Sequence, residues 1–155
     1  MLGYFDTEFI DDGHTIDLIS IGLVREDGKE LYLENKDCDL SRADPWVREH
    51  VISKLGQTTP VTRRTIKAEV LDFCGAYPEF WGYFADYDWV VFCQLFGRMI
   101  DLPNGWPMFC LDVKQEMHRK ELKKPEHLRN DNAHNALDDA RWTRQLHLWV
   151  MEQPE

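Results

Sequence analysis

The stretch YFDTEF, residues 4–9, is typical of a strand and carries two carboxylates, Asp6 and Glu8, close to the amino terminus. Side chains on a strand alternate between its two faces, so these two acids project from the same face. Two like charges at this spacing repel each other and raise each other's pKa. A purely structural strand gains nothing from such a pair, whereas a site for a divalent cation requires it. The motif therefore predicts a metal site on the first strand.

The residues on both sides of this stretch predict an antiparallel meander. LGYFDTEF (2–9) predicts the first strand, TIDLISIGLV (15–24) the second and LYLEN (31–35) the third. The segments DDGH (11–14) and REDGKE (25–30) both contain Gly and predict the connecting turns.

Predicted helices and strands alternate along the remaining two thirds of the chain. Apolar spacing and capping residues, such as Asp44 followed by Pro45, predict helices over 44–55, 62–77, 86–99 and 133–151. Apolar runs predict strands over 79–85 and 107–113, and the polar segment 123–132 predicts a loop. This order favours an α/β fold in which helices flank a mixed β-sheet.

Composition and charge limit the class of protein. The chain has 155 residues, of which 43% are hydrophobic and 30% charged, as expected for a single globular domain spanning 1–155. We found no apolar run typical of a signal peptide or a membrane span, and the four Cys lack CxxC spacing, which favours a cytoplasmic protein with reduced thiols. The net charge of −10 argues against a general nucleic-acid coat. This charge remains compatible with an enzyme that binds a nucleic acid locally through a bound metal ion.

The last predicted helix supplies a further acid for the metal site. At about 100° per residue, one side of this helix carries the residues Ala136, Ala140, Thr143, Leu146 and Val150. Asp139 falls within this apolar face, whereas Asp138 falls on the opposite face. An ionised carboxylate on an apolar face costs several kcal/mol unless it is paired or bound to metal. Asp139 is therefore a candidate ligand, and a core acid that is either neutral or paired with Arg is the alternative.

Two further regions contain candidates that spacing alone does not resolve. Asp86 and Asp88 precede an apolar helix, and one of them is expected to act only as a helix cap. His134 lies five residues before Asp139, where a neutral imidazole near a metal-bound water would act as a general base. A structural or merely exposed His is the alternative for His134.

The motifs DTE, ADYD and HNALDDA, in this order, resemble those of the DEDDh 3′-5′ exonucleases of the ribonuclease H-like superfamily. The segments DTEFI, DGHTI and YD followed by CQL are similar to those of a compact, mycobacterial-type subfamily of bacterial and phage exoribonucleases. The similarity covers nearly the whole chain. One departure is that Phe84 and Ala85 stand where many relatives carry an Asn, three residues before the aromatic residue of the second motif.

The resemblance implies a role for each candidate residue. Asp6, Glu8, Asp88 and Asp139 would hold two divalent cations, Mg²⁺ or Mn²⁺, and His134 would be the general base. The expected reaction removes nucleoside 5′-monophosphates from single-stranded 3′ ends of RNA or from 3′ overhangs. The resemblance also suggests a homodimer.

Two residues near the first strand are candidates for contacting substrate. Phe9 is a candidate for stacking on the terminal base, with core packing as the alternative, and His14 is a candidate for contacting substrate. The basic segment 118–124 would follow the phosphate backbone if it binds at all. A DNA or short-oligonucleotide exonuclease and an inactive nucleic-acid-binding module on the same fold are the alternative functions.

Overall fold

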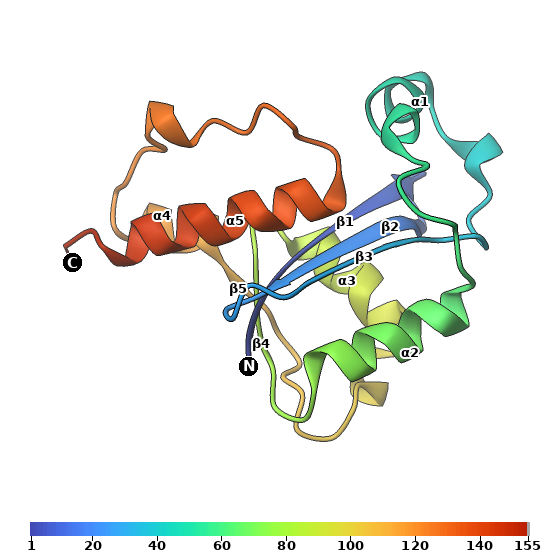
Figure 1. Ribbon diagram of the computed structural model, residues 1–155, viewed down its shortest axis with the longest axis horizontal. Coiled ribbons are helices and arrows are strands. Elements are labelled where there is room, and N and C mark those ends of the chain that lie inside the picture. The colour runs from blue at the N-terminus through green and yellow to red at the C-terminus, as the bar shows by residue number, and fades with distance from the viewer. Residues whose placement is uncertain (155) are drawn as a thin grey trace.

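A mixed five-stranded sheet forms the centre of the computed structural model, which describes residues 1–154 (Figure 1). Its strand order is β3-β2-β1-β4-β5. The strands are β1 (Leu2–Asp11), β2 (Ile16–Arg25), β3 (Glu30–Glu34), β4 (Glu79–Gly82) and β5 (Leu111–Asp112). The first three pair antiparallel, whereas β4 is parallel to β1 and β5 is parallel to β4. The predicted meander and the predicted mixed sheet are therefore both confirmed.

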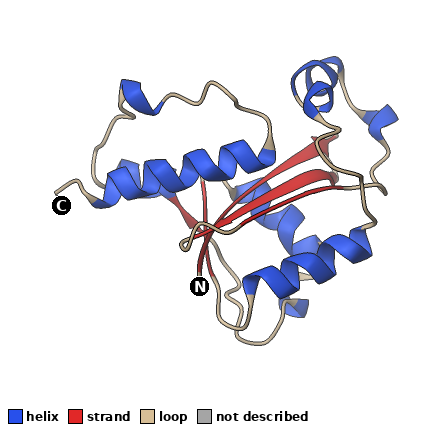
Figure 2. Ribbon diagram, viewed as in Figure 1, coloured by secondary structure: helices blue, strands red, loops and turns tan. Residues whose placement is uncertain are grey.

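Helices cover both faces of the sheet (Figure 2). Their bounds are α1 (Pro45–His50), α2 (Arg63–Cys74), α3 (Asp86–Gln94), α4 (Val113–Arg119) and α5 (Ala136–Met151). Short 3₁₀ segments occupy Leu40–Arg42, Ile52–Lys54, Met99–Asp101 and Glu126–Leu128. Helix α5 lies across one face and packs against α4, while α2 and α3 lie on the other face. The site described below lies where β1 meets α3 and the start of α5.

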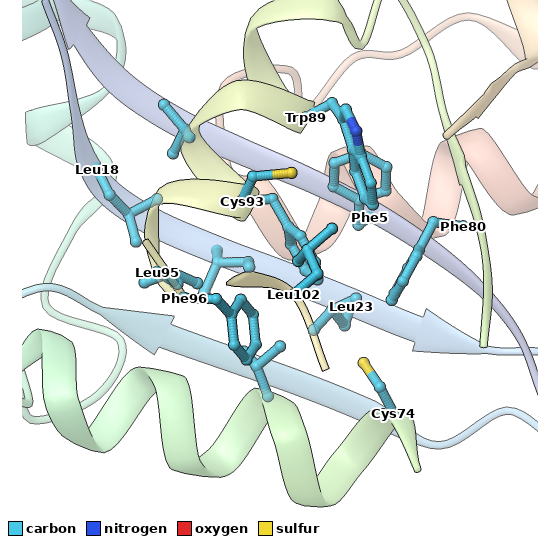
Figure 3. Close-up of a cluster of buried hydrophobic side chains, with 14 of the residues drawn as sticks. Phe5, Leu18, Leu23, Cys74, Phe80, Trp89, Cys93, Leu95, Phe96 and Leu102 are labelled. Atoms are coloured by element: carbon cyan, nitrogen blue, oxygen red, sulfur yellow. The ribbon is translucent and has the colours of Figure 1, made fainter. Parts of the chain in front are cut away.

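The larger core lies between the sheet and the helices α2 and α3 (Figure 3). Phe5 of β1 contacts Phe80, Trp89 and Phe92, with ring centroids 5.5–6.1 Å apart. Alternation along β1 directs Tyr4 to the opposite face, where it packs with Ala140 of α5. Asp6 and Glu8 have the same parity as Tyr4 and therefore belong to the α5 face.

Helix α5 is held unusually close to the sheet. A Cβ atom added at Gly22 of β2 would lie 2.3 Å from the carbonyl oxygen of Ala136, so only glycine allows this approach. Asn135 caps the helix, and its side chain accepts hydrogen bonds from the backbone amides of Leu137 and Asp138. The first turn of α5, which carries Asp139, is thereby fixed over β2.

Several predicted element bounds were wrong. The closing helix begins at Ala136 rather than at residue 133, because Asn135 is its cap and His134 has a left-handed backbone with φ of 74°. The helix predicted over 44–55 is interrupted at Val51, which is buried against the cluster around Ile10 and Ile19.

The region after the second core helix was also predicted incompletely. Of the strand expected over 107–113, only Leu111–Asp112 pairs with β4. Asp112 then caps α4, a helix that the sequence analysis did not predict, by accepting from the amides of Lys114 and Gln115. Among residues 1–154, no helix combines the length and the apolar character needed to cross a membrane.

Candidate active site

Asp6 and Glu8 of β1 line a cavity of about 410 Å³ at the end of the sheet where β1 meets α5. We call it the carboxylate cavity. Its lining includes all five residues that the sequence predicted for metal binding and catalysis, namely Asp6, Glu8, Asp88, Asp139 and His134. Three separate elements and one loop thus bring together acids up to 133 positions apart in the chain.

Asp139 points inward from the first turn of α5. One of its carboxylate oxygens accepts from the Asn130 side-chain amide at 2.5 Å, and the other accepts from the His134 backbone amide at 2.8 Å. Asp138 instead pairs with Arg141 on the outer face at 2.9 Å. The orientation that the helical wheel predicted for these neighbouring acids is therefore confirmed.

Asp88 reaches the cavity from α3. Its Oδ1 accepts from the Thr7 backbone amide at 2.9 Å and from the Thr7 hydroxyl at 2.6 Å, which ties α3 to β1 between Asp6 and Glu8. The Asp88 side chain is only 7% exposed, whereas Asp86 is exposed to solvent. Neither acid caps the helix, since the cap residue is Ala85 and its amide donates to Asp112. The structure therefore brings Asp88, and not Asp86, into the cavity.

His134 lies in the loop that precedes α5, with its ring at the wall of the carboxylate cavity. The Trp46 ring meets it edge-on at 4.9 Å between centroids, and Trp46 in turn stacks on His50 at 4.6 Å. The Lys54 ammonium donates to the Ala133 carbonyl beside it. Partial burial lowers the pKa of His134 against the opposing effect of Asp139, so its imidazole is neutral at pH 7.

The carboxylates destabilise one another's charged forms. Burial and then the charges of Asp88, Asp139 and Glu8 raise the pKa of Asp6 well above its usual range. Burial and then the charges of Asp139 and Asp88 raise the pKa of Glu8 to about 8, with Lys54 acting in the opposite direction. Burial likewise raises the pKa of Asp88 to about 6 and raises that of Asp139. The positive charge of Lys54 is therefore too little to stabilise the cluster in its ionised form.

The donor atoms fit a divalent cation. Oδ2 of Asp6 is buried, and no hydrogen-bond partner for it exists among residues 1–154. One ligand atom each from Glu8, His134 and Asp139 lie within 4.8 Å of one another. Oxygen-rich clusters of this kind suit Mg²⁺ or Mn²⁺, and an ion bound there would remove the mutual repulsion.

The two predicted substrate contacts differ in position. Phe9 lines the carboxylate cavity and contacts Tyr87 at 6.3 Å between ring centroids, while it also packs against the larger core. His14 lies in the exposed turn after β1 and is outside the lining of this cavity. The turn is held by Asp12, which accepts from the amides of His14 and Thr15.

Besides Thr7, which binds Asp88, three residues of the site were not predicted from the sequence. Trp46 forms a wall of the carboxylate cavity, Asn130 binds Asp139, and Lys54 supports the loop that carries His134. An exposed Trp directly after the predicted Asp44-Pro45 helix start was the one available signal. Nothing in the spacing of residues 54 and 130 relates them to residues 133–139.

The structure shows the backbone conformation at the departing position of the second motif. Phe84 has a left-handed backbone with φ of 52°, and its side chain is 64% exposed. Asn adopts this conformation more readily than an aromatic residue does. The Asn expected at this position from the resemblance therefore suits the backbone that Phe84 is forced to adopt.

The comparisons with known proteins agree with this geometry. A sequence model of the 3′-5′ exoribonuclease Rv2179c-like domain matches residues 3–151. The 3′-5′ exoribonucleases MT2234.1 and Rv2179c, from two strains of Mycobacterium tuberculosis, are each 39% identical to this chain over 145 residues. Each alignment covers 89% of this chain and 86% of the relative.

Two solved structures share the fold. A chain of the zinc-bound E. coli ExoI–ssDNA complex matches 99% of this chain with a TM-score of 0.66 and 13% identity. This chain spans 41% of that ExoI chain. A chain from yeast NOT1 MIF4G domain co-crystallised with CAF1 matches 98% of this chain, over 81% of its own length, with a TM-score of 0.50 and 10% identity. At these identities the likeness concerns the fold alone.

Proposed function

The chain belongs to the Rv2179c-like 3′-5′ exoribonuclease domain family, and from this premise we propose that it removes nucleoside 5′-monophosphates from the 3′ ends of single-stranded RNA. The observation that carries the proposal is the convergence of four carboxylates and one neutral imidazole in a single cavity. The unpartnered Asp6 oxygen and the raised pKa values of these acids support a cluster that is completed by cations.

Asp6, Glu8, Asp88 and Asp139 would hold two divalent cations, Mg²⁺ or Mn²⁺. Bound there, such ions supply charge stabilisation at a phosphodiester and lower the pKa of a bound water. The protein's own contribution is to fix the four acids. Thr7 orients Asp88, and both Asn130 and the His134 backbone amide orient Asp139.

His134 would accept the proton of the attacking water on a ring nitrogen. Its lowered pKa keeps the imidazole neutral at pH 7, which is the form that acts as a base. Its position is set by the hydrogen bond from its backbone amide to Asp139 and by the Trp46 ring. The protonated imidazole would then be stabilised by the adjacent Asp139 carboxylate.

Phe9 and Trp46 would flank the terminal nucleoside. Both aromatic rings line the carboxylate cavity, and Trp46 is 51% exposed, so its surface is available to a ligand. Stacking of a base on an aromatic ring contributes about 1–3 kcal/mol and does not depend strongly on base identity. A free 3′ end is needed to reach these rings, so single-stranded tails are the expected substrates.

The test compares RNA and DNA oligonucleotides of the same sequence, labelled at the 5′ end, in the presence of Mn²⁺ or Mg²⁺. The proposal requires a ladder that shortens from the 3′ end and stops when excess chelator is added. Internal fragments that appear before the ladder would indicate an endonuclease. Equal rates on RNA and DNA would remove the preference for RNA that the relatives' names suggest.

The homodimer is a separate part of the proposal. Its support here is the exposed apolar side chains beside the edge strand β5, including Met108 and Phe109. Light scattering during size-exclusion chromatography should give twice the chain mass of 18.4 kDa. A mass equal to one chain would refute the dimer without affecting the proposed chemistry.

A further inference from the structure

A second cavity of about 440 Å³ adjoins the carboxylate cavity. The two share Asp6, His134 and Asp139 in their linings, so the carboxylate cluster lies at their junction. The second cavity extends away from the cluster between Tyr83, which follows β4, the loop that leads into α5, and α5 itself. Its remaining lining consists of Tyr83, Lys124, Arg129, Asn130, Asp131, Ala133, Trp142 and Thr143.

The two cavities differ in charge. Among the residues that the structure describes, those lining the carboxylate cavity include six acids and no Lys or Arg. That environment suits an uncharged nucleoside and bound cations but repels further phosphates. The lining of the second cavity includes the cations Lys124 and Arg129 beside three acids, Asp6, Asp131 and Asp139. The chain has a net charge of −10, and the two basic side chains place positive charge next to the cluster, where a polyanion can bind.

Lys124 is positioned by the aromatic wall of the second cavity. Its ammonium lies over the Trp142 ring, 5.2 Å from the centroid. Trp142 is only 8% exposed, its indole N–H donates to the Leu128 carbonyl at 2.8 Å, and Tyr83 contacts its ring edge-on at 4.7 Å. A cation held against a rigid ring loses little conformational freedom when it binds an anion.

Three other basic side chains of this region, those of Arg129, Arg119 and Lys120, contact acids or backbone carbonyls. Arg129 pairs with Glu126 at 3.0 Å and approaches Asp131 at 4.0 Å, which offsets its charge. Arg119 pairs with Glu116, and the Lys120 ammonium donates to the Gln153 carbonyl. Of the basic segment 118–124, it is Lys124 that lines the second cavity, so the segment does not act as a uniform patch.

We propose that the second cavity holds the strand on the 5′ side of the scissile bond, with Lys124 binding a phosphate upstream of the one that is cleaved. This inference rests on the proposed function and adds a direction to it. The terminal nucleoside occupies the carboxylate cavity, the scissile phosphate lies at the junction, and the rest of the strand leaves past Lys124 and Tyr83. Lys124 is then a specificity residue that favours chains longer than a dinucleotide.

The experiment measures KM for two RNA substrates at a fixed Mn²⁺ concentration. One is a dinucleotide without a 5′ phosphate, whose single phosphate is the scissile one, and the other is an oligoribonucleotide of about a dozen nucleotides. Wild type is compared with Lys124→Gln, Lys124→Arg and Lys123→Gln. Lys123 is the matched control, because it is exposed, carries the same charge and lies outside both cavities.

One lost phosphate contact to a single strand corresponds to about fivefold in affinity at 0.1 M salt, with a salt slope about 0.7 less steep. Lys124→Gln should therefore raise KM for the longer RNA about fivefold and leave KM for the dinucleotide unchanged. Lys124→Arg should restore the wild-type value, since it keeps both the charge and the contact with Trp142. Lys123→Gln should change neither KM.

Three results would overturn the inference while leaving the proposed function intact. These are an unchanged KM for the longer RNA in Lys124→Gln, an equal rise for both substrates, and an equal rise in Lys123→Gln and Lys124→Gln. The last would mean that only overall charge matters. Wild-type protein that shortens neither substrate from its 3′ end would instead refute the proposed function itself.

Discussion

Asp88 should destabilise the protein when metal is absent, and replacing it with Asn should reverse that effect. The Asp88 side chain is 7% exposed, and burial raises its pKa from 3.8 to about 6. Each pKa unit corresponds to about 1.4 kcal/mol, so ionisation of Asp88 costs the metal-free native state about 3 kcal/mol. The Asn side chain keeps an oxygen that accepts from Thr7 but carries no charge.

The sign of the pH dependence follows from the direction of this shift. A folded pKa above the unfolded value means that the native state binds more protons between the two values. Stability is therefore lost as pH rises from about 4 to above 6, and remains low at higher pH. In excess chelator, Asp88→Asn should exceed wild type by about 3 kcal/mol above pH 7 and by about 1 kcal/mol near pH 4.5.

Urea unfolding in chelator at these two pH values measures the difference. Asp86→Asn is the control, because Asp86 is exposed in the first turn of the same helix and its loss should cost at most about 1 kcal/mol. Mn²⁺ at one hundred times Kd for a single site should stabilise wild type by about 2.7 kcal/mol and should stabilise Asp88→Asn by less. The reasoning fails if Asp88→Asn gains nothing in chelator at pH 8, or if Asp86→Asn gains as much.

Four further substitutions separate the roles of neighbouring residues. Asp139→Asn should abolish Mn²⁺ binding and turnover while the fold persists. Asp138→Asn should lower the free energy of unfolding by only a few tenths of a kcal/mol, through the loss of its surface pair. Calorimetry of Mn²⁺ binding beside turnover assays distinguishes the two variants, and the reverse pattern would refute the assignment. His134→Ala should keep metal binding and slow turnover roughly 10²–10⁴-fold, and an unchanged rate in steady-state assays would exclude it as the base. Lys54→Met should lower kcat about tenfold, because it releases the loop before α5. The Mn²⁺ affinity of this variant should be equal to or higher than that of wild type, because a nearby cation is removed. A raised KM with unchanged kcat would show that Lys54 contacts substrate instead.

The predictions from sequence succeeded where a short-range period governs the structure. Alternation along β1 placed Asp6 and Glu8 on one face, and the 3.6-residue period of α5 separated Asp139 from Asp138. The choice of Asp88 over Asp86 came from the resemblance. In the structure its physical reason is the pair of hydrogen bonds from Thr7, which no local pattern reveals.

The residues that escaped prediction depend on long-range packing. The Lys54 contact with Ala133 joins segments 79 positions apart, and the Asn130 contact with Asp139 depends on the path of a polar loop. Helix α4 has two buried apolar side chains, Val113 and Met117, in seven residues. That pattern is too short to distinguish a helix from a loop, and the helix exists because both side chains pack against α5.

The central claim is that four carboxylates and His134 form one cation-dependent site. Anomalous diffraction from crystals soaked in Mn²⁺ tests it most directly, because it locates each ion among the side chains that hold it. We expect peaks enclosed by Asp6, Glu8, Asp88 and Asp139, and the loss of these peaks in Asp139→Asn. Well-diffracting wild-type crystals in saturating Mn²⁺ with no peak between these carboxylates would contradict the account.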